Sequence, residues 1–256
     1  MLVLALAVGP AFSASAADFR LESASVKPRQ AFFDARGGVA FRFRFEATGP
    51  EDVSVRIAGG GREVRRFELK DLEPGPRHEV VWNGIAHSGK PARDGAYRVL
   101  VGAAGSDLKL AGHVILRGQR YPVLGPHGGR GAVGEFGAAR SGGRWHQGFD
   151  VLARCGTPLV AARGGTVTRR RYDPRLDGHF VVISGHKEGM TYRYSHLTAP
   201  AKVRKGERVQ TGQRIGFVGK TGNARTTPCH LHFEMRKRSG RFVDPEPHLR
   251  RWDRHS

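Results

Sequence analysis

Three short segments of the chain hold the residue types best suited to catalysis. They are His146-Gln147-Gly148-Phe149-Asp150, Tyr194-Ser195-His196-Leu197 and His230-Leu231-His232-Phe233-Glu234. Imidazole nitrogens and carboxylate oxygens are ligands that Zn²⁺ takes in proteins, and a neutral imidazole is also a general base near pH 7. Each segment is short enough to occur by chance, so only their combination indicates a metal-dependent hydrolytic site.

The third segment has the pattern of a β-strand. Side chains alternate in direction along a strand, so His230, His232 and Glu234 project from one face while the intervening apolar residues pack on the other. The two imidazoles then lie roughly 7 Å apart, at about 3.3 Å per residue. One of them can bind a metal while the other faces whatever the metal binds. An ordinary pair of surface histidines is the alternative interpretation.

The first segment needs a bend to bring its two polar ends together. In a straight strand His146 and Asp150 would stand roughly 13 Å apart, too far to share one ion. Gly148 permits a loop carrying His146 to lead into a strand carrying Asp150, and it disfavours a helix. A surface histidine before a strand is the alternative. Together with one further histidine, the pair supplies the three ligands of a catalytic zinc, with one position open for water.

Hydrolysis at zinc also needs a base for the water and stabilisation of the oxyanion. The chain has no His-Glu-x-x-His helix to supply a glutamate base. His196 and His230 are therefore the candidates for moving the proton. Glu234 shares a face with the ligands and is a candidate for orienting an imidazole, although a solvent-exposed strand carboxylate fits its position equally well.

The chain has two cysteines, Cys155 and Cys229. In an exported protein an isolated pair favours a disulfide, with zinc ligation as the alternative. Cys229 is next to His230 and so points to the opposite face of the strand, and Cys155 is an odd five residues from Asp150. We therefore predict a disulfide behind the site that ties the two ligand segments together.

The elements that must position these residues are strands. The 256 residues include 36 Gly and 14 Pro, and short Val, Phe and Tyr runs replace any long apolar pattern of helical period. We predict a mainly β fold with two domains. Residues 18–118 carry turn signals at the spacing of a β-sandwich, residues 119–144 form a Gly/Arg-rich linker and loop, and residues 145–256 form a second β-domain with the histidines.

The first residues predict export. Residues 1–17 form an apolar run that ends in Ala14-Ser15-Ala16-Ala17, the pattern of a signal peptide and its cleavage site. The run is too short to span a bilayer, and no other stretch approaches about 18 apolar residues. We expect a secreted monomer without a membrane span, extracellular or associated with a cell wall.

The formal net charge of +20 predicts attraction to polyanions. Nucleic acid, anionic membrane and the acidic polymers of a bacterial envelope fit this charge equally well, as does an arginine-rich surface without a partner. Single-stranded nucleic acid is disfavoured because no aromatic residues are interleaved with the basic ones. We predict anionic cell-wall polymers as partners and no specific nucleic acid.

The second domain resembles the lysostaphin- or LytM-type zinc metallopeptidases over about 120 residues. The matching stretches are His146-x-Gly148-x-Asp150, residues 156–162 with 165–167, Tyr194-x-His196-Leu197, residues 205–206 with 212–216 and 219–222, and His230-Leu231-His232-Phe233-Glu234. The resemblance implies a twisted antiparallel β-domain of the duplicated hybrid motif type. It also implies a single Zn²⁺ held by His146, Asp150 and His232, with His196 and His230 acting on the water and the transition state.

The same resemblance implies a substrate: peptide bonds in the stem peptides or cross-bridges of peptidoglycan. Family members that have lost ligands activate cell-wall amidases, so a non-catalytic wall-binding or amidase-activating module is the alternative; all five site residues are present here. The chain departs from the family in its cysteine pair and in arginines near the groove: Arg140, Arg144 and Arg169 to Arg171. In the first domain, residues 82–84, 89–91 and 94–99 resemble the end of the immunoglobulin-like domain of flagellar hook-capping proteins.

Overall fold

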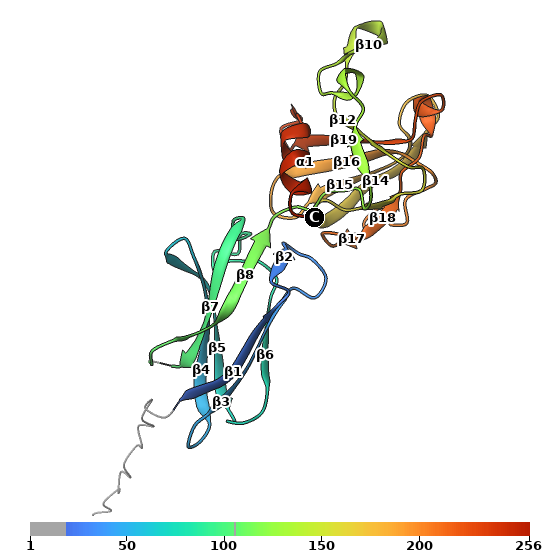
Figure 1. The fold of residues 1–256 in the computed structure, drawn as a ribbon. Helices are drawn as coiled ribbons and strands as arrows, with labels where there is room; N and C mark the ends of the chain where they lie inside the picture. Colours follow the sequence, from blue (N-terminus) through green and yellow to red (C-terminus); the bar gives the residue numbers. More distant parts are fainter. Residues whose placement is uncertain (1–18, 105) are drawn as a thin grey trace, which may run out of the picture.

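The computed structural model describes residues 19–104 and 106–256, which form two β-domains, each with its own hydrophobic core (Figure 1). The predicted signal peptide, residues 1–17, lies outside the described residues. The mainly β fold is confirmed. Among the described residues there is one α-helix, α1 (Glu246–Asp253), at the carboxyl end of the chain.

The first domain is built from two sheets. One has the order β1 (Arg20–Lys27), β3 (Val39–Glu46), β6 (His78–Trp82), and the other has the order β2 (Gln30–Phe32), β8 (Lys109–Arg117), β7 (Gly95–Ala103), β4 (Glu51–Gly59), β5 (Arg62–Leu72). In β3 alternate residues are apolar, and Phe41, Phe43 and Phe45 are buried. They share one core with Val55 of β4 and Val99 of β7, so the two sheets form a sandwich. That this sandwich has an immunoglobulin-like fold stays a prediction.

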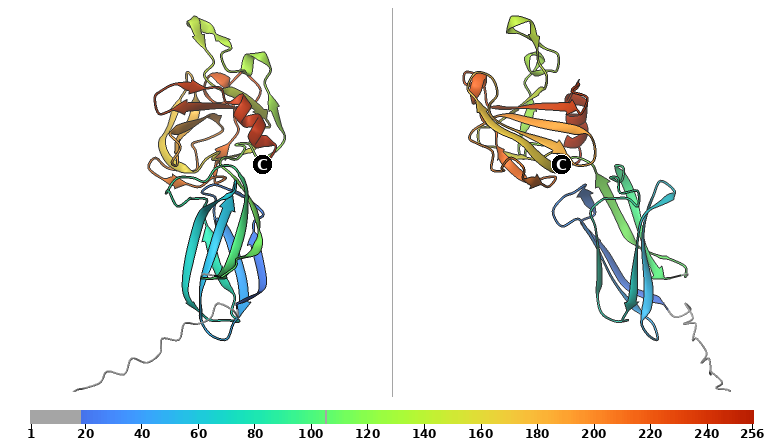
Figure 2. Two further views of the ribbon diagram at one scale, coloured as in Figure 1. Left: turned by 90° about the vertical axis from the view of Figure 1, so that its left-hand side faces the viewer. Right: turned by 180° about the vertical axis from the view of Figure 1, so that it is seen from behind.

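The two domains are stacked end to end (Figure 2), and ion pairs join them across the junction. Asp34 of the first domain lies 2.6 Å from Arg208 and 3.3 Å from His186 of the second. Arg163 is only 3% exposed, and its guanidinium carbon lies 3.9 Å from the centre of the Phe33 ring. Burial of a charged group against an aromatic face indicates a packed junction between the domains.

The second domain is organised around an eight-stranded antiparallel sheet. Its order is β17 (Arg208–Val209), β14 (Gly165–Asp173), β15 (Gly178–Gly185), β16 (Met190–Leu197), β19 (His230–Lys237), β12 (Phe149–Ala153), β9 (His127–Gly129), with β20 (Phe242–Val243) paired to β19. Two further pairs are β13 (Pro158–Val160) with β18 (Arg214–Phe217) and the short hairpin β10 (Ala139–Arg140) with β11 (Arg144–Trp145). The hairpin projects from the body of the domain (Figure 1).

One face of the large sheet carries the core of the second domain. Leu231, Phe233 and Met235 of β19 are buried there together with Trp252 of α1, so the opposite face is left for the polar residues of β19. The segment predicted as a linker, residues 119–144, begins inside this domain: its Tyr121 is buried in the core, and β9 pairs with β12.

Candidate metal centre

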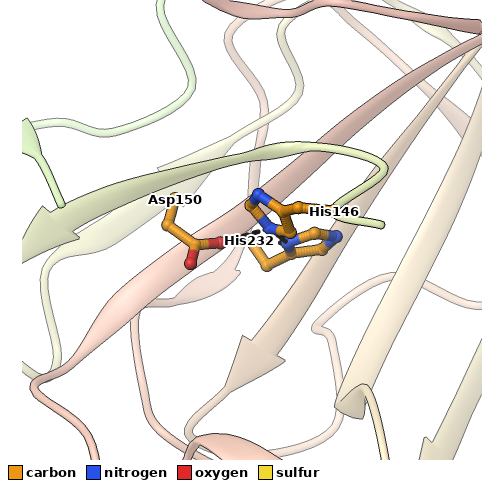
Figure 3. A group of neighbouring side chains, drawn as sticks. All are labelled: His146, Asp150 and His232. Atoms are coloured by element: carbon orange, nitrogen blue, oxygen red, sulfur yellow. Dashed lines mark hydrogen bonds and ion pairs between the residues drawn. The ribbon is translucent and has the colours of Figure 1, made fainter. Parts of the chain in front are cut away.

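Two neighbouring strands and one loop bring three of the predicted site residues together. In the antiparallel pair β12 and β19, Asp150 lies directly opposite His232, and such partners have Cβ atoms about 4.5–5.5 Å apart on one face. The Nδ1 of His232 is therefore 3.0 Å from Oδ1 of Asp150. His146 comes from the loop after β11, and its Nε2 lies 3.1 Å from the same oxygen and 2.8 Å from Nδ1 of His232 (Figure 3).

The bend between His146 and Asp150 depends on Gly148 for a reason of space. A Cβ at position 148 would lie 2.5 Å from the carbonyl oxygen of Phe233 and 2.9 Å from Cε1 of His232. The loop must therefore cross β19 at backbone contact distance, which only glycine permits. This close crossing sets His146 over the pair formed by Asp150 and His232.

The hydrogen bonds of the two imidazoles fix where their lone pairs point. Nδ1 of His146 lies 2.8 Å from the carbonyl oxygen of Glu135, and Nε2 of His232 lies 3.0 Å from Oε1 of Glu234. Carbonyl and carboxylate oxygens only accept, so these nitrogens donate and the other nitrogen of each neutral ring carries a lone pair. Both lone pairs and the Asp150 oxygen then converge on one point. A cation between these three acceptors would satisfy all of them, and two nitrogens with one oxygen are a ligand set that Zn²⁺ takes in proteins.

The electrostatics of this group favour a positive charge at its centre. Burial opposes ionisation of Asp150, but the neighbouring imidazoles of His146 and His232 outweigh it and hold its pKa well below the usual value. Burial disfavours the charged form of His232, yet Asp150 and Glu234 raise its pKa to about 9. The second Asp150 oxygen accepts from Arg130 Nη1 at 3.0 Å. The carboxylates that favour a proton on His232 equally favour a metal cation beside it.

His196 and His230 face the same centre as neutral bases. Their Nδ1 atoms lie 2.9 Å from the carbonyl oxygens of Thr221 and Pro228, so each ring keeps an unprotonated Nε2. His230 Nε2 is 3.8 Å from Oδ2 of Asp150, and the two ring centres are 4.9 Å apart. Burial, helped by His232 and His230, lowers the pKa of His196 to about 4, and burial also lowers that of His230.

A bulge in β16 turns His196 toward the site. Ser195 lies opposite His232, so strict alternation would point His196 to the other face. The pairing of β15 with β16 shifts register between His179 and Val181, and His196 has φ of 64°. A non-glycine residue with positive φ at a bulge is a costly conformation that the surrounding structure must hold in place. Here the hydrogen bond to Thr221 holds it.

The centre lies in a groove of about 1250 Å³. Its walls include Arg144 and Trp145 of the β10–β11 hairpin, and its floor includes Arg193 of β16 and Arg236 of β19. Behind β19 the predicted disulfide joins Cys155 to Cys229, with Cα atoms 5.3 Å apart. The cysteines are thus not ligands.

Sequence reasoning missed two of the residues that hold the site. Arg130 lies in the Gly/Arg-rich segment, where nothing in the sequence shows that β9 pairs with β12 and brings it to Asp150. Arg193 lies 3.4 Å from Glu234 and 2.6 Å from Asp177. Alternation from His196 would have placed Arg193 on the opposite face, and only the bulge in β16 brings both side chains to the groove, so the sequence holds no signal for it.

The second domain is similar to known proteins. Residues 144–245 match the family model described as Peptidase family M23. The chain is 38% identical over 119 residues to a lipoprotein NlpD/LppB homolog of Pseudomonas aeruginosa, covering 46% of this chain and 37% of that protein. It is 37% identical over 124 residues to an L-Ala--D-Glu endopeptidase of Bacillus subtilis, covering 44% and 37%. It is 42% identical over 90 residues to the peptidoglycan DD-endopeptidase ShyA of Vibrio cholerae, covering 35% and 20%. The chain thus spans well under half the length of these relatives.

Proposed function

We propose that this chain, which carries a domain of peptidase family M23, is a zinc-dependent endopeptidase that hydrolyses peptide bonds in peptidoglycan. The observation that carries the proposal is the convergence of lone pairs from His146 and His232 with the Asp150 carboxylate, beside two neutral imidazoles. The names of the B. subtilis and V. cholerae relatives support peptide bonds of peptidoglycan as the target.

His146, Asp150 and His232 would hold one Zn²⁺. When bound, the ion would supply an electrophile that lowers the pKa of a water and polarises the substrate carbonyl. His196 and His230 take the proton of the attacking water at Nε2, because burial keeps both rings neutral. In the protonated form the same nitrogens donate to the oxyanion or to the leaving amine. Glu234 and Arg130 keep His232 and Asp150 in position.

We place this activity in the bacterial cell envelope, where the proposed substrate lies. The signal-peptide pattern of residues 1–17 supports export, and the net charge of +20 supports retention on anionic wall polymers. None of the described helices has the length and apolar character needed to cross a lipid bilayer. We propose that the protein acts as a monomer.

Turnover tests the proposal directly. The purified full chain with Zn²⁺ is expected to release fragments from peptidoglycan, to lose this activity with a chelator and to regain it with added Zn²⁺. His230→Ala should lower the rate by about 10²- to 10⁴-fold without unfolding the protein, because it removes a proton-transfer group. His113→Ala, an exposed histidine of β8, is the matched control. Wall binding with no cleavage in any preparation would instead favour the non-catalytic module.

A further inference from the structure

The acidic side chains of the groove are all engaged within the protein. Asp150 belongs to the metal centre, and Glu234 accepts from His232. Asp177 accepts from Arg193 at 2.6 Å and from the Ser195 hydroxyl at 2.9 Å. Among the residues that the structure describes, the groove therefore offers no free carboxylate to a cationic ligand.

Most of the basic side chains of the groove, by contrast, have no acidic partner among the described residues. Five of them, Arg144, Arg169, Arg236, Lys237 and Arg238, line the groove and are exposed. The ion pairs of residues 19–104 and 106–256 include none of the five. Some are held in place by neutral contacts: Arg144 Nε donates to the carbonyl of Ser141, and Arg236 Nε donates to that of Gly240. The groove thus carries positioned positive charge without a partner in the protein.

Two of these charges lie toward the same part of the groove, because Trp145, next to Arg144, and the Arg236 guanidinium both contact the Phe242 ring. Arg144 is two residues before His146, on the hairpin wall. Arg236 is four residues beyond His232 along β19, roughly 13 Å away at 3.3 Å per residue. An extended peptide advances about 3.3–3.6 Å per residue. When its cleaved bond lies at the metal ligands, side chains three or four residues away along the peptide reach these arginines.

We propose that the groove selects peptides that carry free carboxylates near the cleaved bond, in preference to uncharged peptides such as a glycine bridge. This inference rests on the proposed function and specifies its substrate. A guanidinium binds a carboxylate through two parallel hydrogen bonds, and a groove walled by protein concentrates the field of like charges. Glutamate linked through its side-chain carboxyl, and a diamino acid with two carboxyl groups, each leave such a carboxylate in a peptide chain.

A matched pair of substrates tests the proposal. One is a cross-linked stem-peptide dimer with its carboxylates free, and the other is the same dimer with those carboxylates converted to carboxamides. An exposed ion pair contributes roughly 1.4- to 5-fold in affinity, so two or more pairs predict about a 10-fold higher kcat/KM for the acidic dimer. The preference should shrink as salt rises from 50 to 300 mM, because exposed charges are screened. A pentaglycine peptide should be the poorest substrate of the three.

Variants assign the preference to the groove. In Arg144→Gln, Arg169→Gln and Arg236→Gln the ratio of kcat/KM for the two dimers should fall toward one, with the acidic dimer losing rate and the amidated dimer changing little. Arg62→Gln and Arg204→Gln, exposed arginines outside the groove, are the matched controls and should keep the ratio.

The outcomes separate this inference from the proposed function. Equal cleavage of both dimers, faster cleavage of the amidated one, or an equal loss of preference in the control variants would overturn the inference while leaving the endopeptidase intact. Failure to cleave any of the peptides or intact peptidoglycan with Zn²⁺ present would overturn the proposed function, and this inference with it.

Discussion

Removal of the Glu234 carboxylate should weaken metal binding without touching a ligand. Nε2 of His232 donates to Oε1 of Glu234 at 3.0 Å, and this bond leaves Nδ1 of the ring free to face Asp150 and His146. In Glu234→Ala the ring loses its acceptor, so it can rotate and can carry its proton on Nδ1, where the metal would bind. Only 12% of the Glu234 side chain is exposed, so water would replace its carboxylate poorly as the acceptor of the His232 hydrogen bond.

The expected loss of metal affinity follows from what a hydrogen bond to a metal-binding histidine contributes. Loss of a carboxylate that orients a metal-binding histidine costs about 10- to 100-fold in metal affinity, which is about 1.4 to 2.8 kcal/mol. Competition with a chromogenic chelator measures the Zn²⁺ dissociation constant independently of any peptide cleavage. Glu234→Gln keeps an oxygen acceptor of the same reach, so its affinity should lie much nearer to that of the unmodified protein.

Glu246→Ala is the matched control, because Glu246 lies on α1 and pairs with Arg250 at the surface. The reasoning is wrong if Glu234→Ala binds Zn²⁺ as tightly as this control. It is also wrong if the Gln variant loses as much affinity as the Ala variant, because the negative charge rather than the acceptor position would then be responsible.

Three further changes test other parts of the structure. Gly148→Ala should destabilise the protein and weaken Zn²⁺ binding because its Cβ would lie 2.5 Å from a backbone oxygen, whereas Gly128→Ala, with open space around the added Cβ, should leave both the melting temperature and the metal affinity unchanged. Replacing Cys155 and Cys229 by serine should lower the free energy of unfolding in urea by up to about 4 kcal/mol, since the disulfide closes a loop with a sequence separation of 74; an unchanged midpoint would refute this. The pKa of His196 falls from 6.5 unfolded to about 4 folded, so its contribution to the stability of the metal-free protein is complete above pH 6.5 and is lost as the pH falls toward 4. That contribution is at most about 3 kcal/mol, and His196→Gln should lose less stability between pH 7 and pH 4.5 than the unmodified protein does.

The sequence alone predicted those features that depend on local pattern. Alternation along residues 230–235 placed His230, His232 and Glu234 on one face and the apolar residues on the other, as the structure has them. The same reasoning gave a loop at His146 and a strand at Asp150. These features are readable because the period of a strand is set by backbone geometry, which acts between residues close together in the chain.

Several determinants of the site arise only in the folded protein. The register that sets Asp150 opposite His232 involves residues 82 positions apart, and a slip of one residue would turn either side chain to the other face. The bulge that redirects His196 depends on a hydrogen bond to Thr221, and the contact of Arg130 with Asp150 depends on β9 joining the edge of the sheet.

By itself the sequence determined which side chains are available and which face of its own strand each occupies. The tertiary structure decided which strands are neighbours, in what register, and therefore which lone pairs meet at one point. The physical reason is that strand pairing gains its free energy from contacts between distant segments, after the entropy of closing the intervening loop has been lost, and no local period in the sequence records that choice.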